Sequence, residues 1–211
     1  MMFIKCFADY RRLFATTQGW KPWRAIKILF VPSLHITCVH RLGHAIVNLW
    51  PPFNWLLLPV YCPLVLMIKL AYNVSLPARA RIDGGLIILH PVGTLVHPNV
   101  RVGRNVTLGN NVVIGVSELK DNRVPEIGDE VVVYTGAKIL GALRVNHHAV
   151  IGANAVVLRD VPAFSIVGGV PARVLRMQQR QRSRSHRFRR RPRPESNVRV
   201  YSDKREGVIH V

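Results

Sequence analysis

The chain has 211 residues, which is enough for one domain with short appendages. Its formal net charge of +19 is uneven, because twelve Lys and Arg residues between positions 176 and 205 face only two acidic residues there. The three cysteines are odd in number and show no Cys-x-x-Cys spacing. This argues against a disulfide-rich secreted scaffold and against a thiolate metal site, and a reduced, cytoplasmic setting is expected.

The first 30 residues predict one or two short helices, broken at Gly19 and Pro22. Charged residues interrupt any apolar core near the start of the sequence, so no secretory signal peptide is expected. Trp20 and Trp23 lie among basic residues, a combination that is typical of a membrane interface. A tryptophan pair packed under a helix is an equal alternative.

Residues 45–68 contain no charged side chain and are about as long as a membrane-spanning helix. Four prolines interrupt the segment: Pro51, Pro52, Pro59 and Pro63. Because prolines leave helix carbonyls without N–H partners, we expect two short apolar helices that form a shallow hairpin in one leaflet. A single span and a helical cap buried in a subunit interface are the alternatives. Residues 1–72 are therefore expected to form a helical, apolar region before the main domain.

The dominant signal of the central sequence is a period of six. A branched aliphatic residue recurs with this period, apart from one gap, at Val96, Val102, Leu108, Ile114, Ile127, Val133, Ile139, Val145, Ile151 and Val157. The residue four positions after each of them is mostly small or β-branched. A period of six fits neither a helix, whose period is about 3.6, nor a plain strand, whose period is about 2.

Such a period is typical of short strands separated by tight turns, wound so that each coil stacks on the last, as in parallel β-helices. The recurring aliphatic residues would fill a narrow prism, with successive coils roughly 4.8 Å apart. The corners need positive φ angles, which we expect at Asn99, Asn105, Asn110, Asn111 and Asn154. A Val-rich β-sandwich is the alternative.

Two breaks in the period mark candidate functional segments. The step that ends at Val96 is eight residues rather than six, and the two extra residues fall at His90 and Pro91. A step of thirteen follows Ile114, so residues 116–124 must leave the prism wall as a loop. Loops on rigid scaffolds commonly carry binding groups.

The hexad pattern stops after Arg173. Residues 182–194 contain almost no apolar side chain, which predicts a disordered basic tail over 177–211. Its expected partner is a polyanion, with anionic lipid headgroups ahead of nucleic acid. A tail that is merely solvated is the alternative.

The hexads and four short phrases resemble the left-handed β-helix acyltransferases of the hexapeptide-repeat superfamily. The phrases are His90-Pro-Val-Gly93, Val124-Pro-Glu-Ile-Gly128, Gly136-Ala-Lys-Ile-Leu-Gly141 and Gly168-Gly-Val-Pro-Ala-Arg173. Within that superfamily the chain looks most like the serine acetyltransferase-like branch, including its members from capsule and exopolysaccharide clusters. The resemblance covers residues 73–176 and implies a mainly β domain, a left-handed parallel β-helix, that assembles as a homotrimer.

The resemblance also implies a reaction: transfer of an acetyl group from acetyl-CoA, a co-substrate rather than a tightly bound cofactor, to a hydroxyl. The hydroxyl must lose its proton as it attacks, and a histidine can accept that proton near neutral pH. His90 matches the catalytic histidine of the family's His-x-x-Gly corner. Gly115 is implied as a backbone donor to the oxyanion of the intermediate.

Carry-over from the family places further residues around the two substrates. Small residues would line the pantetheine arm of coenzyme A, and cationic residues would contact its phosphates. The expected cofactor contacts are Gly115, Thr135, Lys138, Ala153, Arg173 and Arg176, and the expected acceptor contacts are Asn110 and Arg123.

The chain departs from serine acetyltransferases at positions that matter for the acceptor. Where that family has an aspartate that orients the catalytic histidine, this chain has Ser75. Ser75, Asp83 or a backbone carbonyl must therefore hold the His90 ring. Val124 stands in place of a second histidine that helps hold the amino acid, and Leu89 replaces the aspartate directly before the catalytic histidine. We therefore expect a sugar hydroxyl, rather than free serine, as the acceptor.

Three further histidines raise a zinc hypothesis, since some hexapeptide-repeat proteins are zinc-dependent carbonic anhydrases. His90 and His97 are seven residues apart, whereas that family uses a spacing of five. His147 and His148 would point to opposite faces of one strand. No metal site is expected.

The sequence thus predicts a homotrimeric O-acetyltransferase that acts on a lipid-linked or growing glycan at the inner face of the cytoplasmic membrane. Residues 45–68 and the basic tail would hold it there. A serine or other small-molecule O-acetyltransferase is the first alternative. A non-catalytic scaffold that binds nucleic acid through its arginines is the second, and nucleic acid is not the expected partner.

Overall fold

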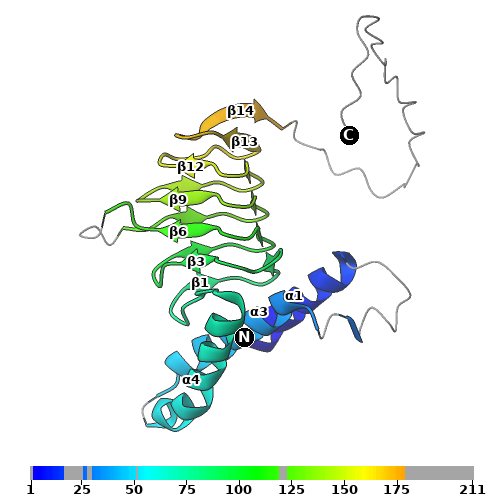
Figure 1. Cartoon of the computed structure of the whole chain (residues 1–211), viewed down its shortest axis with the longest axis vertical. Helices are drawn as coiled ribbons and strands as arrows, with labels where there is room; N and C mark the ends of the chain where they lie inside the picture. Colours follow the sequence, from blue (N-terminus) through cyan, green and yellow to red (C-terminus); the bar gives the residue numbers. More distant parts are fainter. Residues whose placement is uncertain (1, 17–25, 28–29, 51, 119–122, 179–211) are drawn as a thin grey trace, which may run out of the picture. The chain divides into compact units, whose positions relative to one another are not determined.

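The computed structural model describes residues 2–16, 26–27, 30–50, 52–118 and 123–178 (Figure 1). Residues 1–180 form one compact unit that contains both the helices and the β-strands. Trp20, Trp23 and nearly all of the basic tail predicted over 177–211 lie outside the described residues.

Three helices precede the strands in the described part of the chain: α1 (Met2–Thr16), α3 (Pro32–Val47) and α4 (Phe53–Tyr72). The strands that follow are short and recur at the intervals that the period of six predicts. They are β1 (Arg81–Ile82), β2 (Ile87–Ile88), β3 (Leu95–Val96), β4 (Arg101–Val102), β5 (Thr107–Leu108), β6 (Val113–Gly115), β7 (Glu126–Ile127), β8 (Val132–Val133), β9 (Lys138–Leu140), β10 (Arg144–Val145), β11 (Val150–Ile151), β12 (Val156–Val157), β13 (Ser165–Gly168) and β14 (Arg173–Met177).

These strands build the three walls of a prism (Figure 1). Sheet I contains β1, β4, β7 and β10; sheet II contains β2, β5, β8, β11, β13 and β14; sheet III contains β3, β6, β9 and β12. The chain visits the three sheets in turn, and equivalent strands of successive coils pair in parallel. The structure therefore confirms the parallel β-helix and excludes the β-sandwich.

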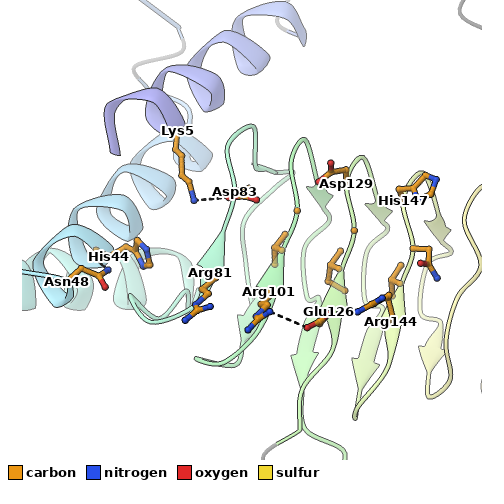
Figure 2. Close-up of a pocket in the computed structure, with 16 residues that line it drawn as sticks. Lys5, His44, Asn48, Arg81, Asp83, Arg101, Glu126, Asp129, Arg144 and His147 are labelled. Atoms are coloured by element: carbon orange, nitrogen blue, oxygen red, sulfur yellow. Dashed lines mark hydrogen bonds and ion pairs between the residues drawn. The ribbon is translucent and has the colours of Figure 1, made fainter. Parts of the chain in front are cut away.

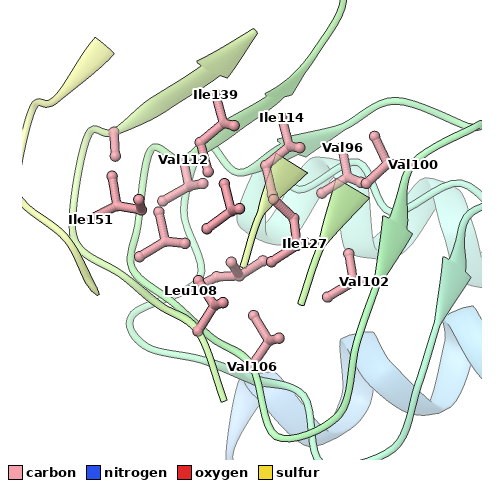
Figure 3. Close-up of a cluster of buried hydrophobic side chains, with 14 of the residues drawn as sticks. Val96, Val100, Val102, Val106, Leu108, Val112, Ile114, Ile127, Ile139 and Ile151 are labelled. Carbon is pink, nitrogen blue, oxygen red and sulfur yellow. The ribbon is translucent and has the colours of Figure 1, made fainter. Parts of the chain in front are cut away.

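The recurring aliphatic residues fill the inside of the prism (Figure 3). All ten of them are at most 4% exposed. Nine of the ten residues four positions later are buried as well, the exception being Glu118 in the loop after Ile114, so two positions of each regular hexad point inward. Since each buried Val, Leu or Ile contributes roughly 1.5–3 kcal/mol, this stack is the main source of stability.

Positive φ angles occur at the corners, although not at every predicted asparagine. Three of the five have them: Asn105, Asn111 and Asn154. Asn99 and Asn110 do not, so that part of the prediction is wrong. Glu130 and His148 also adopt positive φ. They occupy the same corner as Asn105, one coil and two coils later, respectively. The position in the coil, rather than the residue type, sets this conformation.

Helices α1 and α3 close the N-terminal end of the prism, where the first coil has no earlier coil to pair with. Asp9 accepts hydrogen bonds from the N–H groups of Gly85 (2.6 Å) and Leu86 (2.9 Å). Arg41 donates to the carbonyl of Asp83 (2.7 Å) and pairs with Asp9 (3.2 Å). Burial raises the pKa of Asp9, and its bonds to Arg41 and to the two N–H groups oppose that rise.

The same edge is covered by two further side chains. The Ser33 hydroxyl accepts a hydrogen bond from the N–H of Ile88 (2.9 Å). The Arg12 guanidinium donates to the carbonyls of Gly85 and Val106. Because an open sheet edge exposes backbone groups that need partners, these polar residues of the helices act as the missing coil.

Helix α4 packs against α3, and the two form a helical hairpin. It is not the predicted hairpin of two short helices within residues 45–68, because α3 lies mostly before that segment. The predicted break at Pro59 and Pro63 is wrong, because both lie inside one helix of 20 residues. Each proline removes a single N–H group and so a single backbone hydrogen bond of the helix. The packing of α4 on α3 stabilises the helix despite these missing bonds. By length and composition alone α4 could cross a membrane. Only 6% of the residues in its most apolar stretch are buried in the structure.

The Asp9–Arg41 pair offers a direct test of the N-terminal cap. Asp9→Asn keeps the shape of the side chain but leaves a buried guanidinium without its counter-charge, so we expect the free energy of unfolding to fall by about 3–5 kcal/mol. Urea denaturation measures this change. Glu118→Gln, at an exposed position, is the control and should change stability by less than about 0.5 kcal/mol. Equal stability of the two variants would show that the pair does not support the cap.

Candidate active site

His90 lies at the corner between sheets II and III, two residues after the end of β2. Its side chain is exposed and its φ is +49°, a conformation that residues other than glycine rarely adopt. The two extra residues of the eight-residue step make this corner longer than those of later coils. Since positive φ also occurs at the other corners, it is the added length that distinguishes this corner.

The strand register places three other predicted residues on the same corner. Ile88 pairs with Leu108, which pairs with Val133, which in turn neighbours Ile151. The residues two positions after these four are His90, Asn110, Thr135 and Ala153. The last three stack on one another, whereas His90 lies in the two-residue extension, and Val92, whose carbonyl accepts from the Asn111 N–H (2.8 Å), stacks on Asn110. We call these four residues the corner column. Among them, the Thr135 hydroxyl donates to the Asn110 amide oxygen (2.7 Å).

The two side chains predicted to orient His90 do not contact it among the described residues. Ser75 joins the edge of sheet III, where its N–H donates to the Thr94 carbonyl (2.9 Å). Asp83 lies at a different corner, between sheets I and II, and forms an ion pair with Lys5 (2.8 Å). Within this chain, Asp83 therefore cannot hold the His90 ring, and its assignment to the catalytic group is corrected.

Gly115 and Lys138 lie on sheet III, the wall that begins at the corner column. A Cβ atom on Gly115 would meet only the His97 Cβ, at 3.7 Å, which is ordinary contact. The fold therefore does not require glycine at this position. The Lys138 ammonium donates to the Gly136 carbonyl (3.3 Å), which places its charge next to Thr135 in the corner column.

The two arginines predicted to contact phosphates lie on β14, at the C-terminal end of the prism. Arg173 pairs with Gly168 and Arg176 with Ile166, so both belong to sheet II rather than sheet III. The N–H of Ala172 donates to the Val156 carbonyl on β12 (2.7 Å), which holds Arg173 close to sheet III. Arg176 is three residues further along β14.

Arg123 lies at the corner between sheets III and I, where it borders an open groove with Arg101 and Arg144. The corner column occupies the opposite edge of sheet III. One chain therefore does not bring Arg123 and His90 together. Residues 119–122 of the predicted loop lie outside the described residues.

A polar groove of about 820 Å³ along sheet I was not predicted (Figure 2). Arg81, Arg101, Glu126 and Arg144 stack along it, each in the position before a buried aliphatic residue. Glu126 is 2.9 Å from the Arg144 guanidinium and 3.7 Å from that of Arg101. The hexad pattern already contained this signal, because the residue before each buried position must point outward.

His147 and His148 do not lie on one strand, so the prediction about their directions is wrong. They form a turn at the corner between sheets I and II, and both rings contact the Phe164 ring, with centroids 5.1 and 4.7 Å away. His148 is also 3.3 Å from the Glu130 carboxylate. In the described part of the chain no group of three or more His, Cys, Asp or Glu side chains has the arrangement of a metal site.

A small cavity of about 120 Å³ lies between α3, α4 and the first coil, and Ser75 and His40 both line it. The His40 ring is 2% exposed. Burial, together with the neighbouring Arg41 charge, lowers the pKa of His40 to about 4, and a backbone contact with Leu76 opposes the shift only in part. His40 is therefore neutral at physiological pH and belongs to the support of the cap.

Comparisons with known proteins give a consistent result. No family model matches the chain. A serine acetyltransferase of Staphylococcus xylosus is 36% identical over 109 residues, which is 51% of this chain and 50% of that protein. A serine acetyltransferase of Mycobacterium tuberculosis is 32% identical over 157 residues, or 74% of this chain and 66% of that protein. The chain spans about half the length of the first curated relatives that it matches.

Solved structures agree with the sequence relatives. The soybean serine acetyltransferase apoenzyme superposes with a TM-score of 0.69 at 27% identity, over 82% of this chain and 69% of that one. The Brucella abortus enzyme in complex with coenzyme A superposes with a TM-score of 0.72 at 25% identity, over 84% of this chain and 68% of that one.

The fold is therefore the left-handed parallel β-helix of the serine acetyltransferases, preceded by helices. The sequence relatives likewise support a hexapeptide-repeat acyltransferase of the serine acetyltransferase type. The narrower prediction of a polysaccharide O-acetyltransferase has no support in these comparisons.

Two glycines of the prism allow the site to be tested apart from the fold. Gly115→Ala should leave stability unchanged within about 0.5 kcal/mol, because there is room for the methyl group. If Gly115 lines the bound thioester, the same change should lower the rate of acetyl transfer. Gly109→Ala is the opposite case, since its Cβ would lie 2.6 Å from the Thr135 backbone nitrogen, and it should destabilise the fold. Thermal unfolding and coenzyme A release measure the two effects, and full activity of Gly115→Ala would contradict the assignment.

The buried His40 predicts a dependence of stability on pH. The folded protein keeps the ring neutral down to about pH 4, whereas the unfolded chain protonates it below its ordinary pKa of 6.5. Stability from this residue is therefore complete above pH 6.5 and is lost as the pH falls toward 4, by roughly 1.4 kcal/mol per pH unit. Denaturant titrations between pH 4 and 7 should show a shallower slope for His40→Phe than for the wild type. Identical slopes would refute the assignment.

Proposed function

We propose that the protein transfers an acetyl group from acetyl-CoA to a hydroxyl, with His90 as the general base. The observation that carries the proposal is the position of His90, exposed on the lengthened corner of the prism that also holds Asn110, Thr135 and Ala153. The likeness to a serine acetyltransferase in complex with coenzyme A supports the same co-substrate for this chain.

The proposed chemistry needs few groups. The neutral imidazole of His90 accepts the proton of the acceptor hydroxyl as its oxygen attacks the thioester carbonyl. Backbone donors, of which Gly115 is the proposed one, stabilise the negative charge that develops on the carbonyl oxygen. When the tetrahedral intermediate collapses, the C–S bond breaks, the coenzyme A sulfur takes the proton from the imidazolium, and the O-acetyl ester remains.

The proposed assembly is a homotrimer, in which the site forms between neighbouring chains. His90 and Arg123 lie at opposite edges of sheet III, so only a second chain can bring the edge with Arg123 to the corner column. The corner of His90 also carries the half-exposed apolar side chains of Leu89, Val92 and Leu95. Contact with a neighbouring chain would cover them.

Two acceptors are supported by different observations. Serine is supported by the relatives and by structures of serine acetyltransferases, one of which is complexed with serine. A sugar hydroxyl, as in polysaccharide or lipid-linked glycan synthesis, is supported by Val124 and Leu89, which cannot donate or accept the hydrogen bonds that hold an amino acid. The comparisons favour serine, which is the first acceptor to test.

The decisive measurement is release of free thiol from acetyl-CoA by the full chain, with L-serine, nucleotide sugars and lipid-linked sugars as acceptors. His90→Ala should reduce the rate by about 10²–10⁴-fold with the active acceptor, because the general base is lost. His148→Ala, at a different corner, is the matched control and should keep the rate of the wild type. Equal rates for wild type and His90→Ala would remove His90 as the base. Thiol release with serine alone would eliminate the sugar acceptor.

A further inference from the structure

The hairpin of α3 and α4 extends from the N-terminal end of the prism (Figure 1). Its base is packed against the prism, since Ile36 of α3 and Ile68 of α4 belong to the same buried cluster as the prism interior. Its tip consists of residues 45–50 and 52–60, which are the end of α3, the described part of the turn and the start of α4. We call this segment the hairpin tip.

Most of the hairpin tip is apolar and exposed, although Ile46 of α3 is buried. In α4 the side chains of Phe53, Trp55, Leu56, Leu57, Leu58 and Val60 are 38–75% exposed. Successive residues of a helix point about 100° apart, so this run covers the whole circumference. A helix that packs on one protein partner shows a single apolar stripe, whereas one that is apolar all round is surrounded by core or by lipid.

The charges around the hairpin suit a lipid surface. No charged residue occurs between Ala45 and Ile68, and the nearest ones, Arg41 and Lys69, lie at the base. Residues 1–72 contain eight Lys and Arg but a single acidic residue, Asp9. Because Asp9 is buried against Arg41, the helical region presents no acidic side chain that would repel anionic headgroups.

The length of the hairpin limits how far it can enter a bilayer. From Phe53 to Ile68 the helix rises about 22 Å, which is less than the hydrocarbon thickness of about 30 Å. Since α4 returns the chain to the prism, the chain enters and leaves on one side. Pro59 and Pro63 also leave two helix carbonyls without N–H partners, which favours a depth that water still reaches.

We infer that the hairpin tip inserts into one leaflet of a lipid bilayer, with the β-helix on the same side as α1. This inference goes beyond the proposed acetyl transfer and does not depend on it. The occupant of the apolar surface is the lipid hydrocarbon, and a second copy of the chain is the competing occupant.

Two leucines provide a matched pair for the test. Leu56 and Leu70 are 75% and 77% exposed and belong to the same helix. They are fourteen residues apart, so they lie within about 40° of the same face. Leu56 is in the hairpin tip, whereas Leu70 is at the base next to Lys69.

The full chain and its Leu56→Asp and Leu70→Asp variants should be sedimented with vesicles of phosphatidylcholine, whose zwitterionic headgroups suppress binding through the basic tail. We expect the wild type and Leu70→Asp to bind alike and Leu56→Asp to bind about tenfold more weakly, because a carboxylate is costly in hydrocarbon. Acyl-chain-brominated phosphatidylcholine should quench tryptophan fluorescence in the wild type, and Trp50→Tyr together with Trp55→Tyr should remove most of that quenching.

Absence of vesicle binding by the wild type, or equal loss in both aspartate variants, would overturn the inference. The inference would also be overturned if light scattering without vesicles showed that Leu56→Asp lowers the mass of the assembly and Leu70→Asp does not. That result would identify a second copy as the partner of the tip. Since none of these measurements uses acetyl-CoA, failure of this inference is distinguishable from failure of the proposed activity.

Discussion

The fold depends on how the first coil of the β-helix satisfies its backbone. Every later coil finds N–H and carbonyl partners on the coil before it, but the first coil has none. Asp9, Arg41, Ser33 and Arg12 provide these partners from α1 and α3. A buried ion pair is costly to form, and here two N–H groups and backbone carbonyls satisfy the remaining bonding capacity of the two charges. The helices are thus part of the prism's end rather than an attachment to it.

Much of this fold could be predicted from the sequence, because a period of six leaves little choice. The same residues that form the repeat are those that must be buried, and each of the ten proved to be buried. The corners were harder to predict. Glu130 and His148 take positive φ because their place in the coil demands it, and residue type gave no warning. The single helix through Pro59 and Pro63 was missed because local preference disfavours it, whereas packing against α3 supports it.

The candidate site was predictable to the extent that it follows the repeat. Asn110, Thr135 and Ala153 share a corner because they share a place in the hexad, and His90 lies in the two-residue extension of that same corner. Asp83 failed as a partner of His90 because seven residues along the chain carry it round a corner onto another edge of the prism. Polar groups of neighbouring coils and chains are not encoded by local spacing. For this reason the sequence alone could not identify a group that orients the His90 ring.

The lengthened corner at His90 and the loop at residues 116–124 are both departures from the period, and neither disturbs the pairing of the coils that flank them. In such a scaffold, residues can be gained or lost at one corner while the coils on either side keep their strand pairing. Evolution can therefore change the residues that contact a substrate at this edge without changing the fold. Residues at these edges, Val124 and Leu89 among them, can therefore change while the β-helix that carries them is retained.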